Sequence, residues 1–192
     1  FYKKVWQSIG GYDTRFRRSR EDSDLVQRCV QSGIKLIQTW EANVYHFSCV
    51  TSRGKNWFDR ENRDAQDRVA LQFIADQIEI RKFIRKWGTA PLYDSYQYPI
   101  VTPKYDIGLV LYNANNQLVE FLEPYFTNIY INNDLSFQYE NKVKNINEEL
   151  SNDIIVEVNA AQLTNDNVEF LLKVPYVLTQ NNKIGTFQFD IF

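Results

Sequence analysis

The sequence predicts an α/β protein in two parts, and three observations lead to this prediction. With 192 residues, of which 44% are hydrophobic and 15% aromatic, the chain can fill a hydrophobic core. Residues 1–104 contain 18 Lys and Arg against 12 Asp and Glu, whereas residues 105–192 contain 4 against 12, so their net charges are +6 and −8. The asparagine content changes at the same place, with three asparagines before Tyr105 and fifteen after it. We therefore expect a domain boundary near residue 105.

A short helix is expected in the first part, beginning near Glu21. Apolar residues recur after this position at helical spacing, namely Leu25, Val26, Cys29 and Val30. Gly33 stands where a left-handed residue would end the helix. Residues 34–36 and 42–46 then alternate between apolar and polar side chains, which predicts a pair of half-buried strands.

A long helix is expected next, from Asp59 to Trp87. It would make about seven turns at ~3.6 residues per turn, and charges of opposite sign alternate along it at four-residue steps. Its expected buried stripe consists of Leu71, Ile74 and Ile78. Residues 88–104 are rich in proline and tyrosine without a clear period, so we expect an extended linker there.

The second part, residues 105–192, alternates between strand and helix patterns. The expected strands are Ile107 to Tyr112, Asn128 to Ile131, Asp153 to Val158 and Thr186 to Ile191. The expected helices are Gln117 to Phe126 and Asp166 to Lys173, and a polar stretch that could be helical lies between the second and third strands. This alternation predicts a small layered α/β domain whose sheet is at least partly parallel. The domain contains neither a Gly-x-Gly-x-x-Gly motif nor a phosphate loop.

Several classes of protein are disfavoured by composition. No window approaches the ~20 apolar residues that would span a bilayer, so we expect a soluble, cytoplasmic location. Cys29 and Cys49 lack metal-binding or redox spacing and are expected to be reduced thiols in the core. The basic first part suits a phosphate-bearing ligand, while the acidic second part would repel nucleic acid.

The residues that carry chemistry lie between Val5 and Gly54. In order, the segment contains Val5-Trp6, Ile9-Gly10-Gly11-Tyr12-Asp13, a basic run, Glu21-Asp22-Ser23-Asp24-Leu25, Arg28, Gly33, Ala42-Asn43-Val44-Tyr45-His46-Phe47 and Ser52-Arg53-Gly54. This order and spacing resemble the C-terminal half of family-2 glycosyltransferases of the GT-A fold, over about residues 1–58. The resemblance implies a partial GT-A subdomain that contains the long helix, followed by the small α/β domain.

Transfer of a sugar requires a base that takes the proton of the acceptor hydroxyl. The resemblance implies that Asp22 is this base in an inverting displacement, and that Glu21 and Asp24 orient it or bind acceptor hydroxyls. In a helix Glu21 and Asp24 share roughly one face, whereas Asp22 points about 100° away, so the three carboxylates have different roles. The alternative is that Asp22 and Asp24 only cap the helix and complement its dipole.

Three further residues complete the expected site. The resemblance implies that His46 helps to bind a divalent metal, Mg or Mn, or the diphosphate; the alternative is a packed core histidine. Arg53 could bind the diphosphate through its planar guanidinium, or be an exposed loop residue. Tyr12 could stack on a sugar, although an aromatic side chain is more often part of a core.

The expected function is transfer of a sugar from a nucleotide-sugar donor to a glycan or other hydroxyl acceptor. The resemblance implies that an N-terminal half with its own Asp-x-Asp binds the nucleotide, and no such motif precedes Val5. We therefore expect residues 1–192 to be a fragment that is inactive alone. The alternative is a noncatalytic glycosyltransferase-like module that docks a partner protein. A basic nucleic-acid binder is disfavoured because no base-reading or stacking motif is found.

Overall fold

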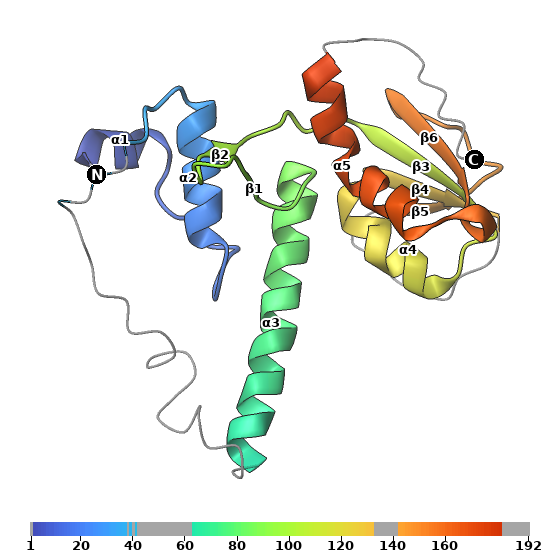
Figure 1. Ribbon diagram of the computed structural model, residues 1–192, viewed down its shortest axis with the longest axis horizontal. Coiled ribbons are helices and arrows are strands. Elements are labelled where there is room, and N and C mark those ends of the chain that lie inside the picture. Colours follow the sequence, from blue (N-terminus) through green and yellow to red (C-terminus); the bar gives the residue numbers. More distant parts are fainter. Residues whose placement is uncertain (1, 38, 40, 42–62, 133–141, 182–192) are drawn as a thin grey trace. The chain divides into compact units, whose positions relative to one another are not determined.

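The computed structural model describes residues 2–37, 39, 41, 63–132 and 142–181, with the backbone alone at 63–72, 142 and 181. Its helices and its parallel four-stranded sheet confirm the α/β class (Figure 1). The chain forms two compact units, Phe1–Ile80 and Arg81–Phe192, each of which is described by itself below. The division falls inside the long helix α3 (Arg63–Trp87), while the composition changes farther along the chain.

The first unit contains α1 (Lys3–Ser8), α2 (Glu21–Gln31) and the first turns of α3. Helix α2 begins at Glu21, as predicted, and ends just before Gly33. Gly33 has a φ of 69°, and the next residue, Ile34, donates its N–H to the Cys29 carbonyl at 3.0 Å. These features are typical of a left-handed helix end, so the predicted stop signal is confirmed. Residues 34–37 form no strand, and the expected partner at 42–46 lies outside the described residues.

The turn after α1 depends on two glycines. Gly10 and Gly11 have φ values of 77° and 68°, a conformation that strongly favours glycine. At Gly11 a β-carbon would also come within 3.0 Å of the Trp6 ring. The turn therefore needs glycine both for its backbone and for the packing of the indole.

The predicted buried stripe of α3 is wrong in part. Ile74 and Ile78 are 54% and 49% exposed, and their neighbour Phe73 is 64% exposed. The side chain of Leu71 lies outside the described residues. Glu79 is buried instead and accepts a hydrogen bond from the Arg17 N–H at 3.0 Å. Helical spacing shows which residues share a face, but it cannot show which face is covered.

The expected linker contains an ordered hairpin. Strands β1 (Leu92–Tyr93) and β2 (Pro99–Ile100) pair antiparallel. Asp94 organises the loop between them, because its Oδ1 accepts the backbone N–H groups of Tyr96 at 2.9 Å and Tyr98 at 2.8 Å. An aspartate that binds nearby backbone amides is a common way to fix a turn.

The second unit is built around the sheet β5-β4-β3-β6, in which all pairs are parallel. Its strands are β3 (Ile107–Tyr112), β4 (Asn128–Ile131), β5 (Lys142–Asn145) and β6 (Ile154–Asn159). The bounds of β3 and β4 match the prediction, and β6 is displaced by one residue. Strand β5 was not predicted, and the expected strand at 186–191 lies outside the described residues.

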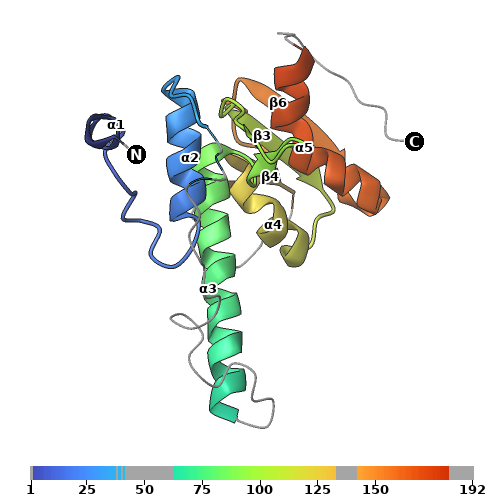
Figure 2. The ribbon, with the colours of Figure 1, turned by 60° about the vertical axis from the view of Figure 1, so that its left-hand side comes forward.

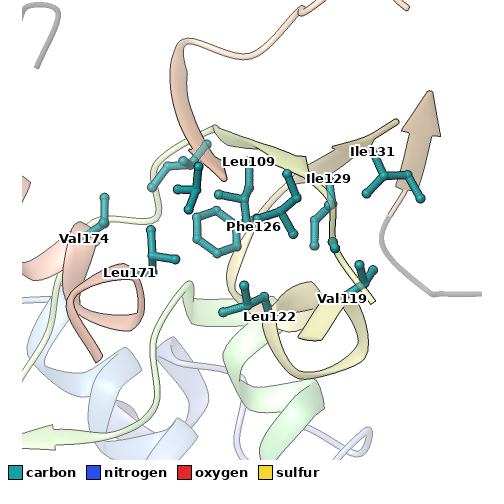
Figure 3. Close-up of a cluster of buried hydrophobic side chains, with 12 residues drawn as sticks. Leu109, Val119, Leu122, Phe126, Ile129, Ile131, Leu171 and Val174 are labelled. Atoms are coloured by element: carbon teal, nitrogen blue, oxygen red, sulfur yellow. The ribbon is translucent and has the colours of Figure 1, made fainter. Parts of the chain in front are cut away.

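One face of this sheet carries the hydrophobic core. Leu109 on β3 and Ile129 on β4 pack against side chains from α4 (Asn116–Leu122) and α5 (Asn165–Asn181), including Val119 and Leu171 (Figure 3). The short 3-10 helix η1 (Glu123–Tyr125) follows α4 directly, so the predicted helix at 117–126 is divided into two elements. A second short helix, η2 (Ala160–Gln162), follows β6.

The opposite face is crossed by residues 146–153, which connect β5 to β6. The connection from β3 to β4 moves toward the β5 edge of the sheet, whereas the connection from β5 to β6 moves back toward the β6 edge. Because both connections are right-handed crossovers, they run over opposite faces of the sheet. Asn152 fixes this segment: its Oδ1 accepts from Asn128 Nδ2 at 3.0 Å and from the Tyr130 hydroxyl at 2.9 Å, and its Nδ2 donates to Asp106. Gly108 lies beneath it, where a β-carbon would be 2.5 Å from Asn152 Oδ1.

Within the second unit, the end of α3 is held to η1 by a buried carboxylate. Glu123 is fully buried, and its Oε2 lies 2.7 Å from Arg81 Nη2 and 2.6 Å from Arg85 Nη2. Arg81 also donates to the Glu120 carbonyl at 2.7 Å. Two arginines thus neutralise one carboxylate, as a buried charge requires.

Candidate functional site

The candidate site is the start of α2, and the loop from α1 leads into it (Figure 2). Arg20 precedes the helix with a φ of 72° and its carbonyl accepts the Asp24 N–H at 2.9 Å. The Arg20 side chain makes no capping hydrogen bond. Glu21, Asp22 and Asp24 therefore all lie in the first turn, as expected, but in three different environments.

Asp22 is the exposed carboxylate of the three. Its Oδ1 accepts the Ser23 N–H at 2.7 Å and lies 3.4 Å from the Ser23 hydroxyl. Among the described residues, its Oδ2 has no hydrogen-bond partner. One oxygen thus satisfies a free amide of the first turn, so the capping alternative describes part of its role, and the other oxygen is open to a ligand.

Asp24 is fully buried and has a structural environment. Its Oδ2 lies 2.9 Å from Nε of Arg28, one helical turn later. The same guanidinium donates to the Ile9 carbonyl and, at 2.6 Å, to the Gly11 carbonyl. This network joins α2 to the glycine turn. Sequence reasoning gave Arg28 no role, although its four-residue spacing from Asp24 was a usable signal.

Three polar atoms at the entry to α2 are buried and, within the described part of the chain, have no hydrogen-bond partner. They are Ser19 Oγ, Arg20 Nε and Glu21 Oε2. Buried polar atoms are nearly always paired, because an unpaired one costs about 1–3 kcal/mol. Within the described residues, the polar groups of the three residues that precede Asp22 are therefore incompletely satisfied.

Tyr12 lies on the loop that leads to this site. The residue is 52% exposed, and its ring makes an edge contact with Trp6, with 5.0 Å between the ring centroids. Nearby, Arg15 forms an ion pair with Asp13 at 2.6 Å. The hydrogen bond to Asp13 raises the pKa of the Arg15 guanidinium. Tyr12 therefore has a free ring surface, while Arg15 is engaged by its neighbour.

His46 and Arg53 lie outside the described residues, so the structure does not place them relative to Asp22. Within residues 2–37, 39, 41, 63–132 and 142–181, no group of three His, Cys, Asp or Glu side chains could hold a metal ion.

Comparison with protein-family models, with curated proteins and with solved structures gave no significant match. The described helices also include none that is long and apolar enough to cross a membrane. The observations that bear on function are therefore the sequence motifs and the geometry at the start of α2.

Proposed function

We propose that this chain forms the acceptor side of an inverting glycosyltransferase that uses a nucleotide-sugar donor. The observation that carries the proposal is the arrangement of Asp22, an exposed carboxylate with one oxygen held by the Ser23 N–H and the other open. A general base requires this combination of fixed orientation and access. The order of the surrounding motifs, from the glycine turn to the acidic helix start, supports the same function.

In the proposed reaction, Asp22 Oδ2 takes the proton of the acceptor hydroxyl. The acceptor oxygen forms a bond to the anomeric carbon while the bond from that carbon to the diphosphate oxygen breaks, so the nucleoside diphosphate leaves from the opposite face. Tyr12 offers an exposed ring to the acceptor sugar. Asp24 is a positioning residue in this proposal, because its buried ion pair with Arg28 holds the glycine turn beside the helix start.

Partners and cofactor follow from the resemblance and are part of the proposal. The donor would be bound by an N-terminal nucleotide-binding half, and His46 and Arg53 would contact the diphosphate or a divalent Mg or Mn ion. Their chemistry suits these tasks, since imidazole is a common metal ligand and guanidinium binds phosphate through two parallel hydrogen bonds.

The proposal is tested with the protein in its full encoded length, by turnover with a panel of nucleotide-sugars and Mn. Asp22→Asn should lower kcat by about 10²- to 10⁴-fold, the usual contribution of a general base. The matched control is Asp166→Asn, which removes an exposed carboxylate from the first turn of α5. Both changes weaken a helix-dipole interaction by about 0.3–1 kcal/mol, so only the loss of a base distinguishes them.

A noncatalytic docking module is the second candidate, and the exposed apolar residues Phe73, Ile74 and Ile78 on α3 favour it. The same experiment decides between the two functions. Turnover that Asp22→Asn removes would support the transferase. Absence of both turnover and nucleotide binding in the full-length protein would support the docking module.

A further inference from the structure

A second group of polar residues lies at the carboxyl edge of the sheet in the second unit. The chain passes from β3 to β4 on one side, whereas β6 lies on the other side of β3. In open α/β sheets, ligands bind outside the carboxyl ends of the strands at the point where the strand order reverses. The ends of β3 and β6 form such a point here.

Three asparagines occupy this position, and we call them the asparagine edge: Asn113 follows β3, Asn132 follows β4 and Asn159 ends β6. Asn113 joins the other two. Its backbone N–H donates to Asn132 Oδ1 at 3.1 Å, and its Nδ2 donates to Asn159 Oδ1, also at 3.1 Å. Asn113 has a φ of 56°, a conformation that asparagine tolerates better than most residues.

These hydrogen bonds fix the orientation of all three amides. Asn132 receives a backbone N–H and must present its oxygen there, and Asn159 likewise receives the Ala161 N–H at 3.2 Å. The Asn113 atom that faces Asn159 Oδ1 must then be nitrogen. Within the described residues, three groups have no partner: Nδ2 of Asn132, Nδ2 of Asn159 and Oδ1 of Asn113. The edge thus presents two oriented donors and one oriented acceptor.

We propose that the asparagine edge binds a neutral sugar. A sugar hydroxyl both donates and accepts, so adjacent hydroxyls match a mixed set of amide donors and acceptors. An aromatic ring lies beside this set: Tyr112 pairs with Asn159 in the sheet register and is 37% exposed. Because paired residues of parallel strands leave the same face, the ring and the Asn159 amide lie on one side of the sheet.

The charge of the described edge residues indicates whether a neutral sugar or a phosphate is the better ligand. The described edge residues 112–118, 132, 145–147 and 159–163 contain neither Lys nor Arg, and none of them is glycine. Phosphate sites usually use basic side chains, glycine-rich loops or helix N-termini. The described edge residues include the starts of α4 and η2, but there the side chains of Asn115 and Asn159 already accept the Leu118 and Ala161 N–H groups. The chemistry of the edge therefore favours an uncharged ligand. This inference does not depend on the transferase proposal, because Asp22 belongs to the other compact unit.

The test is a titration of the isotopically labelled 192-residue chain, followed by the NMR signals of the asparagine side-chain amides. The probes are the methyl glycosides of glucose, galactose, mannose, rhamnose and N-acetylglucosamine, with inorganic phosphate as the charged comparison. We expect at least one glycoside to shift the Asn132 and Asn159 amide signals in a saturable manner, while phosphate does not.

Two variants make the test specific. Asn132→Asp and Asn159→Asp keep the oxygen that accepts the backbone N–H but remove the free donor, so each should weaken binding by about fivefold. Gln77→Glu is the control, since it makes the same exchange of an amide for a carboxylate at an exposed residue of α3 in the other compact unit, and it should bind like the unchanged chain. The inference is overturned if no glycoside shifts these signals, if phosphate alone shifts them, or if all three variants bind equally.

Discussion

Asp24 and Arg28 form an ion pair within α2, with 2.9 Å between Oδ2 and Nε, and this pair also holds the turn that precedes the helix. Nη1 and Nη2 of the guanidinium donate to the carbonyls of Ile9 and Gly11. One arginine thus neutralises a buried carboxylate and satisfies two backbone acceptors. The position of the exposed Asp22 depends on this network, because both acidic residues belong to the same helical turn.

Arg28→Met should destabilise the first unit by about 3–5 kcal/mol, because it removes the guanidinium that neutralises the buried Asp24 carboxylate. Hydrogen exchange of the α2 amides is the appropriate measurement, since a chain with two compact units need not unfold in one step. The double variant Asp24→Asn/Arg28→Met removes both charges and should be more stable than Arg28→Met alone. Equal protection in the two variants would show that the buried charge is unimportant.

Gly108→Ala should destabilise the second unit by about 1–3 kcal/mol, because the new β-carbon would lie 2.5 Å from Asn152 Oδ1. Hydrogen exchange in β3 would measure this loss. The control is the combination with Asn152→Ala, which removes the clashing atom. Since the two residues share one steric conflict, the double variant should cost less than the sum of the single variants, and strict additivity would contradict the close approach.

The strands of the second unit could be predicted because parallel strands are buried on both faces and form continuous apolar runs. Ile107–Tyr112 and Asn128–Ile131 have this pattern and were assigned with the observed bounds. Strand β5 has the sequence Lys-Val-Lys-Asn, with a single apolar residue. It is a strand because its backbone pairs with β4 at the edge of the sheet, and pairing of this kind leaves no hydrophobic run in the sequence.

The site was predictable to the level of its helical turn and no further. The start of α2 and the separate direction of Asp22 follow from motif and helical geometry. Burial of Asp24 does not, because it depends on carbonyl groups that a distant glycine turn brings to Arg28. Ile74 and Ile78 illustrate the same limit, since their spacing is helical but the face they form is exposed.

Glu123→Ala should destabilise the second unit by about 3–5 kcal/mol, because Arg81 and Arg85 would lose the buried carboxylate that they share. Unfolding in urea, monitored by hydrogen exchange of the α4 amides, would measure the effect. Glu120→Ala is the matched control on the preceding turn. Its side chain is exposed and only its carbonyl is used by Arg81, so the change should stay within about 0.5 kcal/mol. A similar loss in both variants would contradict a specific role for the ion pairs.

Cys29 should react slowly with iodoacetamide in the native protein. Its side chain is 1% exposed, and burial raises the pKa of the thiol. The thiolate is the reactive form, so a raised pKa lowers its population near neutral pH, and the rate should increase as the pH rises toward and beyond the ordinary thiol range. Mass spectrometry of the Cys29 peptide, with and without urea, measures both effects separately from Cys49. Rapid native labelling at pH 7, equal to that in urea, would show that α2 opens readily and that its buried face does not protect the thiol.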